Sequence, residues 1–232
     1  MTAIPPPGEN FIALYKPKGP TSHDVVDAVR KATGERTVGH AGTLDPLARG
    51  ILVVAIGRAA TRQLKTIVGS EKEYIADIRL GASSTTDDAE GTTTMFPPSA
   101  IPDRDAVVNA LQKFVGTIEQ TPPAYSAVKI RGAPAHRRMR RGETIELKSR
   151  AVTIQKIELL SYAWPDLRIR VTTGPGVYIR ALARDIGAAL GTAGYLADLE
   201  RTRVGAYTSK MAVPLDRITA ALSSRARVAS AR

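Results

Sequence analysis

The chain has 232 residues, of which 43% are hydrophobic, and it contains no cysteine. Its length allows a buried core, and the lack of cysteine excludes disulfides, a thiolate nucleophile and cysteine-bound zinc or iron–sulfur sites. Lysine and arginine total 33 against 22 acidic residues, so the formal net charge is +11. This surplus favours a polyanionic partner such as a nucleic acid, although a generic basic surface would give the same balance.

The sequence carries few signs of a membrane segment or a metal centre. Its apolar runs are shorter than the ~20 residues that span a bilayer, and residues 1–8 lack the basic region and apolar core of a signal peptide. The histidines His23, His40 and His136 do not show a His-x-x-x-His spacing. We therefore expect a cytoplasmic protein without a membrane partner or a bound metal. We also expect a monomer, since nothing in the sequence indicates a dimer interface.

The first 34 residues are predicted to contain one strand and one helix after an N-terminal lead. Residues 1–9 are predicted to be a flexible, proline-rich lead, and residues 11–15 an apolar strand. Thr21 or Ser22 then caps a helix that ends at Gly34 and has Asp24 in its first turn. Its apolar stripe consists of Val25, Val26 and Val29.

The rest of the chain mixes strands and helices irregularly. Strands are predicted at 51–56, 73–80, 145–147, 151–160 and 166–173, and helices at 58–68, 103–115 and 177–190. In the helix at 103–115, Val107, Leu111 and Phe114 are expected to point inward. Residues 83–94 are predicted to be a loop, 121–144 lack a clean period, and 196–204 form another ordered segment. This order favours an α+β fold over a series of parallel βαβ units.

Residues 39–46 are the most informative segment. They place Asp45 between Leu44 and Pro46, although aspartate prefers water unless it is paired. Pro46 restricts Asp45 to extended conformations, so we expect a rigid loop that presents Asp45 and His40 ahead of a buried strand. A simple turn in which Asp45 caps the next segment would fit this local pattern as well.

Segment 39–46 resembles the signature of the TruB-type tRNA pseudouridine synthases of bacteria, which isomerise the uridine at position 55 in the TΨC loop of tRNA. Further matching blocks follow the family's order, at 16–19, 21–24, 72–74, 88–91, 122–129, 178–185 and 199–205. The resemblance implies a central, mostly antiparallel sheet flanked by helices, with a catalytic cleft. It also implies a catalytic domain over 10–216 with an RNA-binding thumb at about 121–144, followed by a basic tail over 217–232.

The resemblance assigns the reaction to three side chains. Asp45 is the catalytic carboxylate, Arg180 keeps it ionised, and Tyr74 stacks against the target base. Without the resemblance, Arg180 would be an exposed helix arginine and Tyr74 a tyrosine on the buried face of a strand. No cofactor is expected, because the isomerisation needs neither a redox change nor an external group.

Other matched residues are expected to bind RNA. His40 fills the space that the flipped base leaves, or else only holds its turn. Leu199 walls the uracil pocket, or is an ordinary core leucine. Asp88 fixes the active-site network, although Asp87 and Glu90 nearby leave a metal ligand as its rival role. Phosphate contacts are predicted for Lys16, Lys18, Lys129, Arg131, Arg137, Arg138, Arg140 and Arg141, or else the thumb residues among them form a solvated charged loop.

The sequence also departs from the family pattern. In the thumb, His136 replaces a tyrosine and Met139 an alanine. Beside the predicted site, Val177 replaces a threonine and Glu200 an arginine. The chain is also expected to lack the family's C-terminal RNA-binding domain. Two alternative functions are a tRNA-folding chaperone with little catalysis and the catalytic subunit of a guide-RNA particle.

Overall fold

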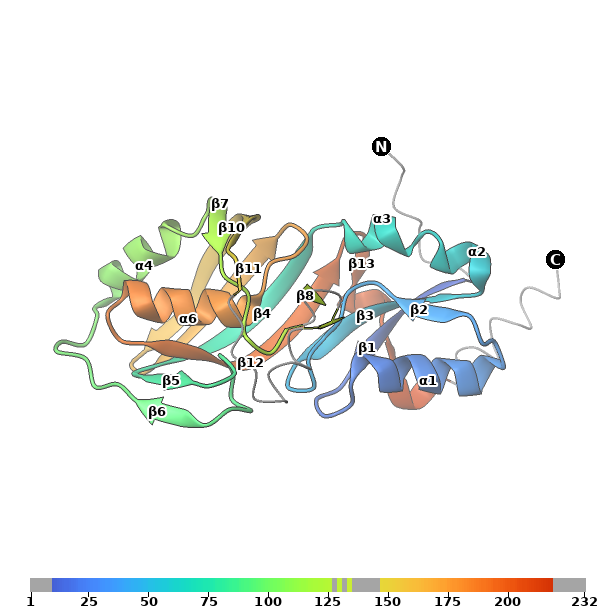
Figure 1. Cartoon of the computed structure of the whole chain (residues 1–232), viewed down its shortest axis with the longest axis horizontal. Coiled ribbons are helices and arrows are strands. Elements are labelled where there is room, and N and C mark those ends of the chain that lie inside the picture. The colour runs from blue at the N-terminus through green and yellow to red at the C-terminus, as the bar shows by residue number, and fades with distance from the viewer. Residues whose placement is uncertain (1–9, 127–128, 131–132, 135–146, 219–232) are drawn as a thin grey trace. The chain divides into compact units, whose positions relative to one another are not determined.

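The computed structural model describes residues 10–126, 129–130, 133–134 and 147–218 (Figure 1). The chain divides into two compact units, one made of residues 1–74 and 199–232 and the other of residues 75–198. The boundary falls within two strands, β4 (Lys72–Leu80) and β12 (Gly194–Val204), so both strands contribute to each unit. In the part of the chain that the structure describes, no helix is long and apolar enough to cross a membrane.

The first unit is built on strands in the order β14-β1-β3-β12-β4. Strand β1 pairs antiparallel with β3, whereas β12 pairs parallel with β3. Strand β2 also pairs with β3, and β13 with β12. The elements are β1 (Phe11–Lys16), α1 (Ser22–Thr33), β2 (Val38–His40), β3 (Arg49–Ile56), α2 (Arg58–Thr61), α3 (Leu64–Val68), β13 (Tyr207–Thr208) and β14 (Val213–Pro214), with short 3-10 helices at Ser209–Met211 and Leu215–Arg217.

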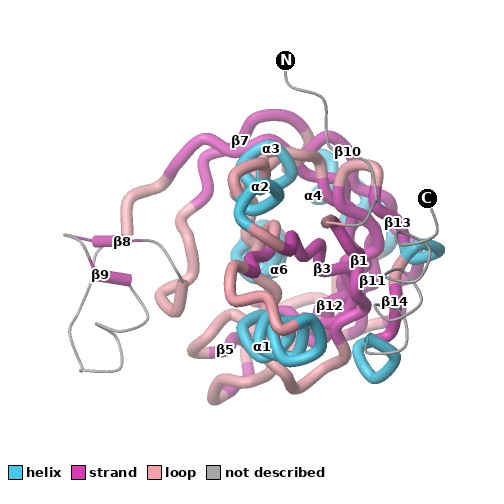
Figure 2. The backbone as a smooth tube through the Cα atoms, turned by 90° about the vertical axis from the view of Figure 1, so that its right-hand side faces the viewer, coloured by secondary structure: helices cyan, strands magenta, loops and turns pink. Residues whose placement is uncertain are grey.

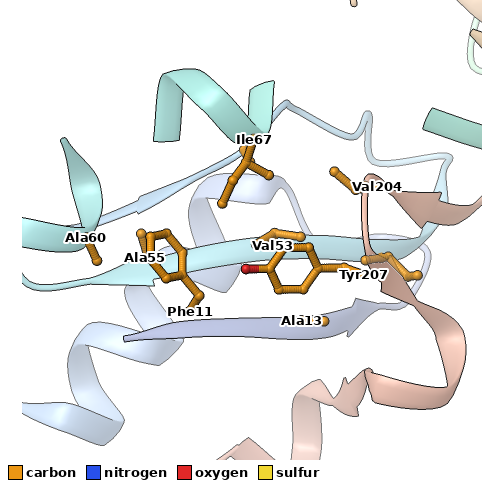
Figure 3. Close-up of a cluster of buried hydrophobic side chains, with 10 residues drawn as sticks. Phe11, Ala13, Val53, Ala55, Ala60, Ile67, Val204 and Tyr207 are labelled. Atoms are coloured by element: carbon orange, nitrogen blue, oxygen red, sulfur yellow. The ribbon is translucent and has the colours of Figure 1, made fainter. Parts of the chain in front are cut away.

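Helices cover both faces of the β1–β3 pair. Alternate residues of these strands, such as Ile12 and Leu52, pack against the valines of α1. The intervening residues, such as Phe11 and Val53, pack with Ala60 of α2 and residues of α3, β12 and β13 (Figure 3). A strand buried on both faces needs apolar residues at successive positions, which explains the continuous apolar run in β3.

Helix α1 has the ends that its sequence predicts. The Thr21 side chain accepts a hydrogen bond from the Asp24 amide, and the Asp24 carboxylate accepts one from the Thr21 amide, which completes a capping box. At the other end, Gly34 adopts φ 72°, a left-handed conformation that glycine takes without strain. The predicted cap, stripe and end of this helix are all confirmed.

The second unit is built on the strand order β12-β4-β11-β10-β7. Strand β10 pairs antiparallel with both β11 and β7. The short strands β8 and β9 form a separate antiparallel pair (Figure 2). The elements are β5 (Ala82–Ser84), β6 (Thr93–Met95), α4 (Arg104–Gln112), β7 (Gly116–Gln120), β8 (Lys129–Ile130), β9 (Ala133–Pro134), β10 (Arg150–Ala163), β11 (Asp166–Thr173) and α6 (Ile179–Ala189).

Helices α4 and α6 lie against each other in the second unit, and α4 also contacts β10 (Figure 1). Leu111 of α4 and Ile186 of α6 are buried. Helix α6 comes so close to the turn before β12 that a Cβ on Gly187 would lie 2.3 Å from the Ala193 carbonyl carbon. The buried face of α6 therefore fixes its position, and with it the direction of its polar side chains.

The predicted fold class, a mixed and mostly antiparallel sheet with helices, is confirmed. Several local predictions are corrected. The helix at 58–68 is split into α2 and α3, and the predicted loop at 83–94 contains the end of β5 and the start of β6. Phe114 lies beyond α4 and is half-buried. Leu147 is not in a strand. The described residues leave out three predicted segments. These are residues 1–9, most of the thumb, and the basic tail after residue 218. The predicted domain limits therefore stay predictions.

Candidate active site

Asp45 lies in the loop 41–48 between β2 and β3, and this loop is fixed by backbone hydrogen bonds along its length. The Ala41 amide donates to the Val53 carbonyl at 2.8 Å, and the Ala48 amide to the Asp45 carbonyl at 3.0 Å. The Pro46 carbonyl accepts from the Gly19 amide at 2.9 Å. The loop is held to β3 and to the turn after β1, as expected for a rigid presentation of Asp45.

Ser22, the first residue of α1, holds the residue before Asp45. Its hydroxyl donates to the Leu44 carbonyl at 2.9 Å and accepts from the Leu44 amide at 2.8 Å. Both backbone polar groups of Leu44 are thereby bound by one serine that is only 3% exposed. Ser22 thus has a second role beside the start of α1, which is to orient the backbone that carries Asp45.

Lys16 is buried rather than exposed, so its predicted phosphate contact is corrected. Its side chain is 0% exposed, and its ammonium donates to the carbonyls of Pro17 at 2.9 Å, Pro20 at 2.8 Å and Pro46 at 3.4 Å. A phosphate cannot reach an ammonium in this position. Lys16 instead ties the turn after β1 to the Asp45 loop. Lys18 is exposed, and its phosphate contact stays a prediction.

Arg201 on β12 is a site residue to which the sequence assigned no role. Its side chain is almost completely buried, and its guanidinium donates to the carbonyls of Ile51 at 2.7 Å, Gly42 at 3.0 Å and Thr43 at 3.5 Å. Burial lowers the pKa of the Arg201 guanidinium. Electrostatic interactions with Tyr74 and Asp45, together with a side-chain hydrogen bond to Tyr74, raise this pKa. The block 199–205 was the available signal, but it did not show that this arginine is buried.

Three further residues with predicted roles, Tyr74, Leu199 and His40, also belong to the first unit. Tyr74 on β4 is 7% exposed and Leu199 on β12 is 6% exposed, so both side chains are largely buried. His40 ends β2 and is partly buried; this burial, with the nearby charges of Arg201 and His23, lowers the pKa of its imidazole. His40 is therefore mostly neutral at pH 7.

Lys72 adds a second buried cation next to Arg201. Its ammonium donates to the carbonyls of Val68 and Ser70, both at 2.8 Å. Burial and the nearby charge of Arg201 lower the pKa of Lys72 to about 8. A Cβ on Gly42 would lie 3.6 Å from both Lys72 Cε and Arg201 Nη1, so these side chains flank the start of the Asp45 loop.

In the second unit, Arg180 and Asp88 form a buried ion pair. Arg180 Nη1 lies 3.4 Å from Asp88 Oδ2, and the two side chains are 8% and 2% exposed. The same guanidinium donates to the carbonyls of Thr86 at 3.2 Å and Tyr125 at 2.9 Å. Asp88 Oδ1 accepts from the Thr86 hydroxyl and the Glu90 amide. Arg180 therefore joins the acidic turn to the segment that leads into the thumb.

Arg184 makes a parallel connection one helical turn further along α6. It pairs with Asp87 at 2.8 Å and donates to the Thr121 carbonyl at 2.9 Å. Burial raises the pKa of Asp87, and the charge of Arg184 opposes this effect. The acidic turn is thus bound by arginines at both of its aspartates. Within the described ranges, no group of three or more histidine or acidic residues could hold a metal ion. The role of Asp88 stays a prediction.

Some predicted features are not placed. The structure does not describe the side chains of the basic thumb residues or of the two thumb positions that depart from the family pattern. These residues are Lys129, Arg131, His136, Arg137, Arg138, Met139, Arg140 and Arg141. The ion pair between Asp45 and Arg180 joins residues of different units and stays a prediction. Glu200, where the family has an arginine, accepts a hydrogen bond from the Tyr15 hydroxyl at 3.1 Å and pairs with Arg49 at 3.2 Å.

Comparison with known proteins supports the same family. Residues 30–179 match the family model of the TruB pseudouridylate synthase N-terminal domain, and residues 180–230 that of the tRNA pseudouridylate synthase B C-terminal domain. The second match begins at Arg180, inside the predicted catalytic domain, and runs into the predicted basic tail. It does not test the expectation that a further C-terminal RNA-binding domain is lacking, which stays a prediction.

The relatives include tRNA pseudouridine synthase B of Thermobifida fusca, which is 49% identical over 220 residues, or 91% of this chain and 75% of that protein. The protein of the same name from Leifsonia xyli is 48% identical and covers 88% of this chain and 70% of its own. Among solved structures, a Cbf5–Nop10–Gar1 complex gives a TM-score of 0.71 at 31% identity, over 91% of this chain and 54% of that one. The chain thus spans about half the length of that structural relative. It belongs to the TruB family of pseudouridylate synthases.

Proposed function

We propose that this protein is a tRNA pseudouridine synthase that isomerises the uridine at position 55 in the TΨC loop, with Asp45 as its catalytic carboxylate. The observation that carries this proposal is the Asp45 loop. Its family signature is complete, and side chains of Ser22, Lys16 and Arg201 bind the carbonyls of residues 42, 43, 44 and 46. The identity of 49% to a tRNA pseudouridine synthase B supports the substrate class.

The reaction rearranges one nucleotide without adding or removing atoms. The bond between N1 and C1′ breaks, the uracil turns, and a bond forms between C5 and C1′. The C5 proton is lost to solvent, and N1 takes up a proton in return. A carboxylate either attacks the nucleotide or removes a sugar proton, and Asp45 is assigned this step without a choice between the two routes.

The fixed loop matters for this chemistry because small displacements of a catalytic group are costly. A shift of ~1 Å can lower a rate by about 100-fold. The hydrogen bonds at Leu44 and Pro46, on either side of Asp45, restrict the backbone before substrate arrives. This preorganisation is what a reaction with no cofactor would require of its single carboxylate.

The other assigned roles follow the family resemblance. Tyr74 stacks on the base and takes the C5 proton late in the reaction, and Arg180 assists the ionised form of Asp45. Because the target base must leave its stack, neutral His40 fills the vacated space. The surplus of basic residues draws the tRNA backbone to the protein, and Lys129 with the thumb arginines supplies phosphate contacts.

A direct test uses release of the C5 hydrogen. An unmodified tRNA transcript labelled with tritium at C5 of its uridines is incubated with the protein, and tritium in water is counted. The matched control is the same transcript with cytidine at position 55. We expect one equivalent of tritium from the first transcript and none from the second. Binding of both transcripts without tritium release would instead favour the tRNA-folding chaperone.

A further inference from the structure

We propose that Arg201 is a positioning residue for the isomerisation, because its buried guanidinium holds the Asp45 loop against β3. The proposal rests on the function proposed above, in which Asp45 is the catalytic carboxylate. Arg201 does not need to touch the substrate for this role. It acts through the backbone of residues 42 and 43, which lead directly to Leu44 and Asp45.

The hydrogen bonds of Arg201 divide between a strand and the loop. Nε donates to the Ile51 carbonyl on β3, while the two terminal nitrogens donate to Gly42 and Thr43. A planar guanidinium holds its donors in a fixed fork, so it sets the distance between the strand and the loop. A lysine ammonium would supply charge but not this spacing.

The backbone of Arg201 is itself fixed in place. Arg201 lies opposite Gly50 in the parallel pairing of β12 with β3. A Cβ on Gly50 would lie 2.3 Å from the Arg201 carbonyl oxygen, so the two backbones are as close as a glycine allows. The contact between Gly50 and Arg201 sets the distance between β12 and the start of β3, which directly follows the Asp45 loop. The guanidinium therefore extends from a backbone whose position relative to the loop is fixed.

The charge of Arg201 also needs an explanation. Ser22 shows that a neutral hydroxyl is enough to bind loop backbone in this unit. A buried guanidinium costs more, because burial penalises its charge, and the nearby Lys72 is a further cation. The groups that favour its charge are Tyr74 and Asp45, which are the proposed catalytic residues of this unit. By the same attraction, Arg201 favours the ionised form of Asp45.

The experiment compares Arg201→Met and Arg201→Lys with the wild type and with Arg203→Met. Arg203 lies two residues further along the same strand and pairs with Glu71 rather than with the loop, so it is a matched control. Each protein is tested for cooperative unfolding, tRNA affinity, single-turnover rate as a function of pH, and amide hydrogen exchange of a peptide that spans 41–50.

We expect Arg201→Met to lower the single-turnover rate by about 100-fold, with tRNA affinity within a few-fold of wild type. Exchange in 41–50 should become faster, and the acid limb of the rate profile should move to higher pH because a cation near Asp45 is lost. Arg201→Lys should keep the acid limb but remain slower than wild type. Arg203→Met should match the wild type in all of these measurements.

A rate for Arg201→Met within threefold of wild type, or unchanged exchange in 41–50, would overturn the proposal. An unchanged acid limb would overturn it too, since a merely structural role predicts that result. If Arg201→Met does not fold, Arg201→Lys decides: a wild-type rate and exchange would overturn the proposal, and a slower rate with faster exchange would support it. If the wild type forms no pseudouridine, the proposed function fails instead.

Discussion

Gly50 and Arg201 face each other so closely that a Cβ on Gly50 would lie 2.3 Å from the Arg201 carbonyl oxygen. Gly50 also has φ 112°, a conformation that L-amino acids rarely adopt. We expect Gly50→Ala to lower the free energy of unfolding by about 3 kcal/mol, because strain adds to overpacking between β3 and β12. Chemical denaturation measures this loss.

The control for that substitution is Gly57→Ala. Gly57 has φ 83°, but a Cβ there would meet no atom within 4 Å, so only backbone strain applies. Its expected loss is about 1 kcal/mol. Equal losses in the two variants would show that the contact between Gly50 and Arg201 is not tight.

Ser22→Ala tests the two hydrogen bonds between the Ser22 hydroxyl and the Leu44 backbone. The substitution removes a hydroxyl that binds both the amide and the carbonyl of Leu44, and it leaves these buried groups without that partner. We expect a loss of about 2 kcal/mol in the free energy of unfolding and a lower turnover rate. Ser70→Ala is the control, since Ser70 is similarly buried but donates only to the Thr66 carbonyl at 3.3 Å. A wild-type turnover rate for Ser22→Ala would show that these hydrogen bonds do not position Asp45 for the reaction.

Asp88→Asn tests the buried ion pair of the second unit. The asparagine amide would face Arg180 Nη1 in place of a carboxylate oxygen, which removes the negative charge of this buried pair. We expect a loss of about 3 kcal/mol in the free energy of unfolding. Asp87→Asn should cost about 1 kcal/mol or less, because its partner Arg184 is 33% exposed. The prediction fails if the two variants have the same unfolding midpoint.

Local signals allowed much of the fold to be predicted. The capping residues of α1 and the alternation of β4 act within a few residues, so the sequence shows them directly. The split between α2 and α3 and the pairing of β5 with β6 were missed, because tertiary contacts decide such short elements. Strand β7 was missed for a similar reason, since its polar residues show little β pattern outside the pairing with β10.

The site was predictable only where the family signature names a residue. Asp45 and Arg180 are found in this way, but nothing near Lys16 or Arg201 shows that these cations are buried. Their partners are backbone carbonyls, which every residue has, and several lie far away in the sequence. Packing decides whether a basic side chain contacts a phosphate or backbone carbonyls elsewhere in the protein. Because Lys16 is buried against such carbonyls, its predicted phosphate contact was wrong.

Lys72 predicts a dependence of stability on pH. Its folded pKa is about 8, below the ordinary value of 10.5, so the unfolded chain binds more protons between these pH values. The free energy of unfolding of the wild type should therefore rise with pH in that window, relative to Lys72→Met. Below pH 7 the difference should be constant. Denaturation curves from pH 6 to 10.5 measure it, with exposed Lys65 substituted as Lys65→Met for control. A difference that stays flat across the window would contradict the buried state of the Lys72 ammonium.

The proposed function depends on Asp45 as the catalytic carboxylate for the uridine at position 55. The most direct test maps pseudouridine to the nucleotide in an unmodified tRNA transcript after a single turnover with wild type or with Asp45→Ala, and measures the tRNA Kd of both. We predict product at position 55 with wild type alone, and Kd values within a few-fold of each other. Measurable product from Asp45→Ala would rule out Asp45 as the catalytic carboxylate, and no product at position 55 from the wild type would rule out the proposed function.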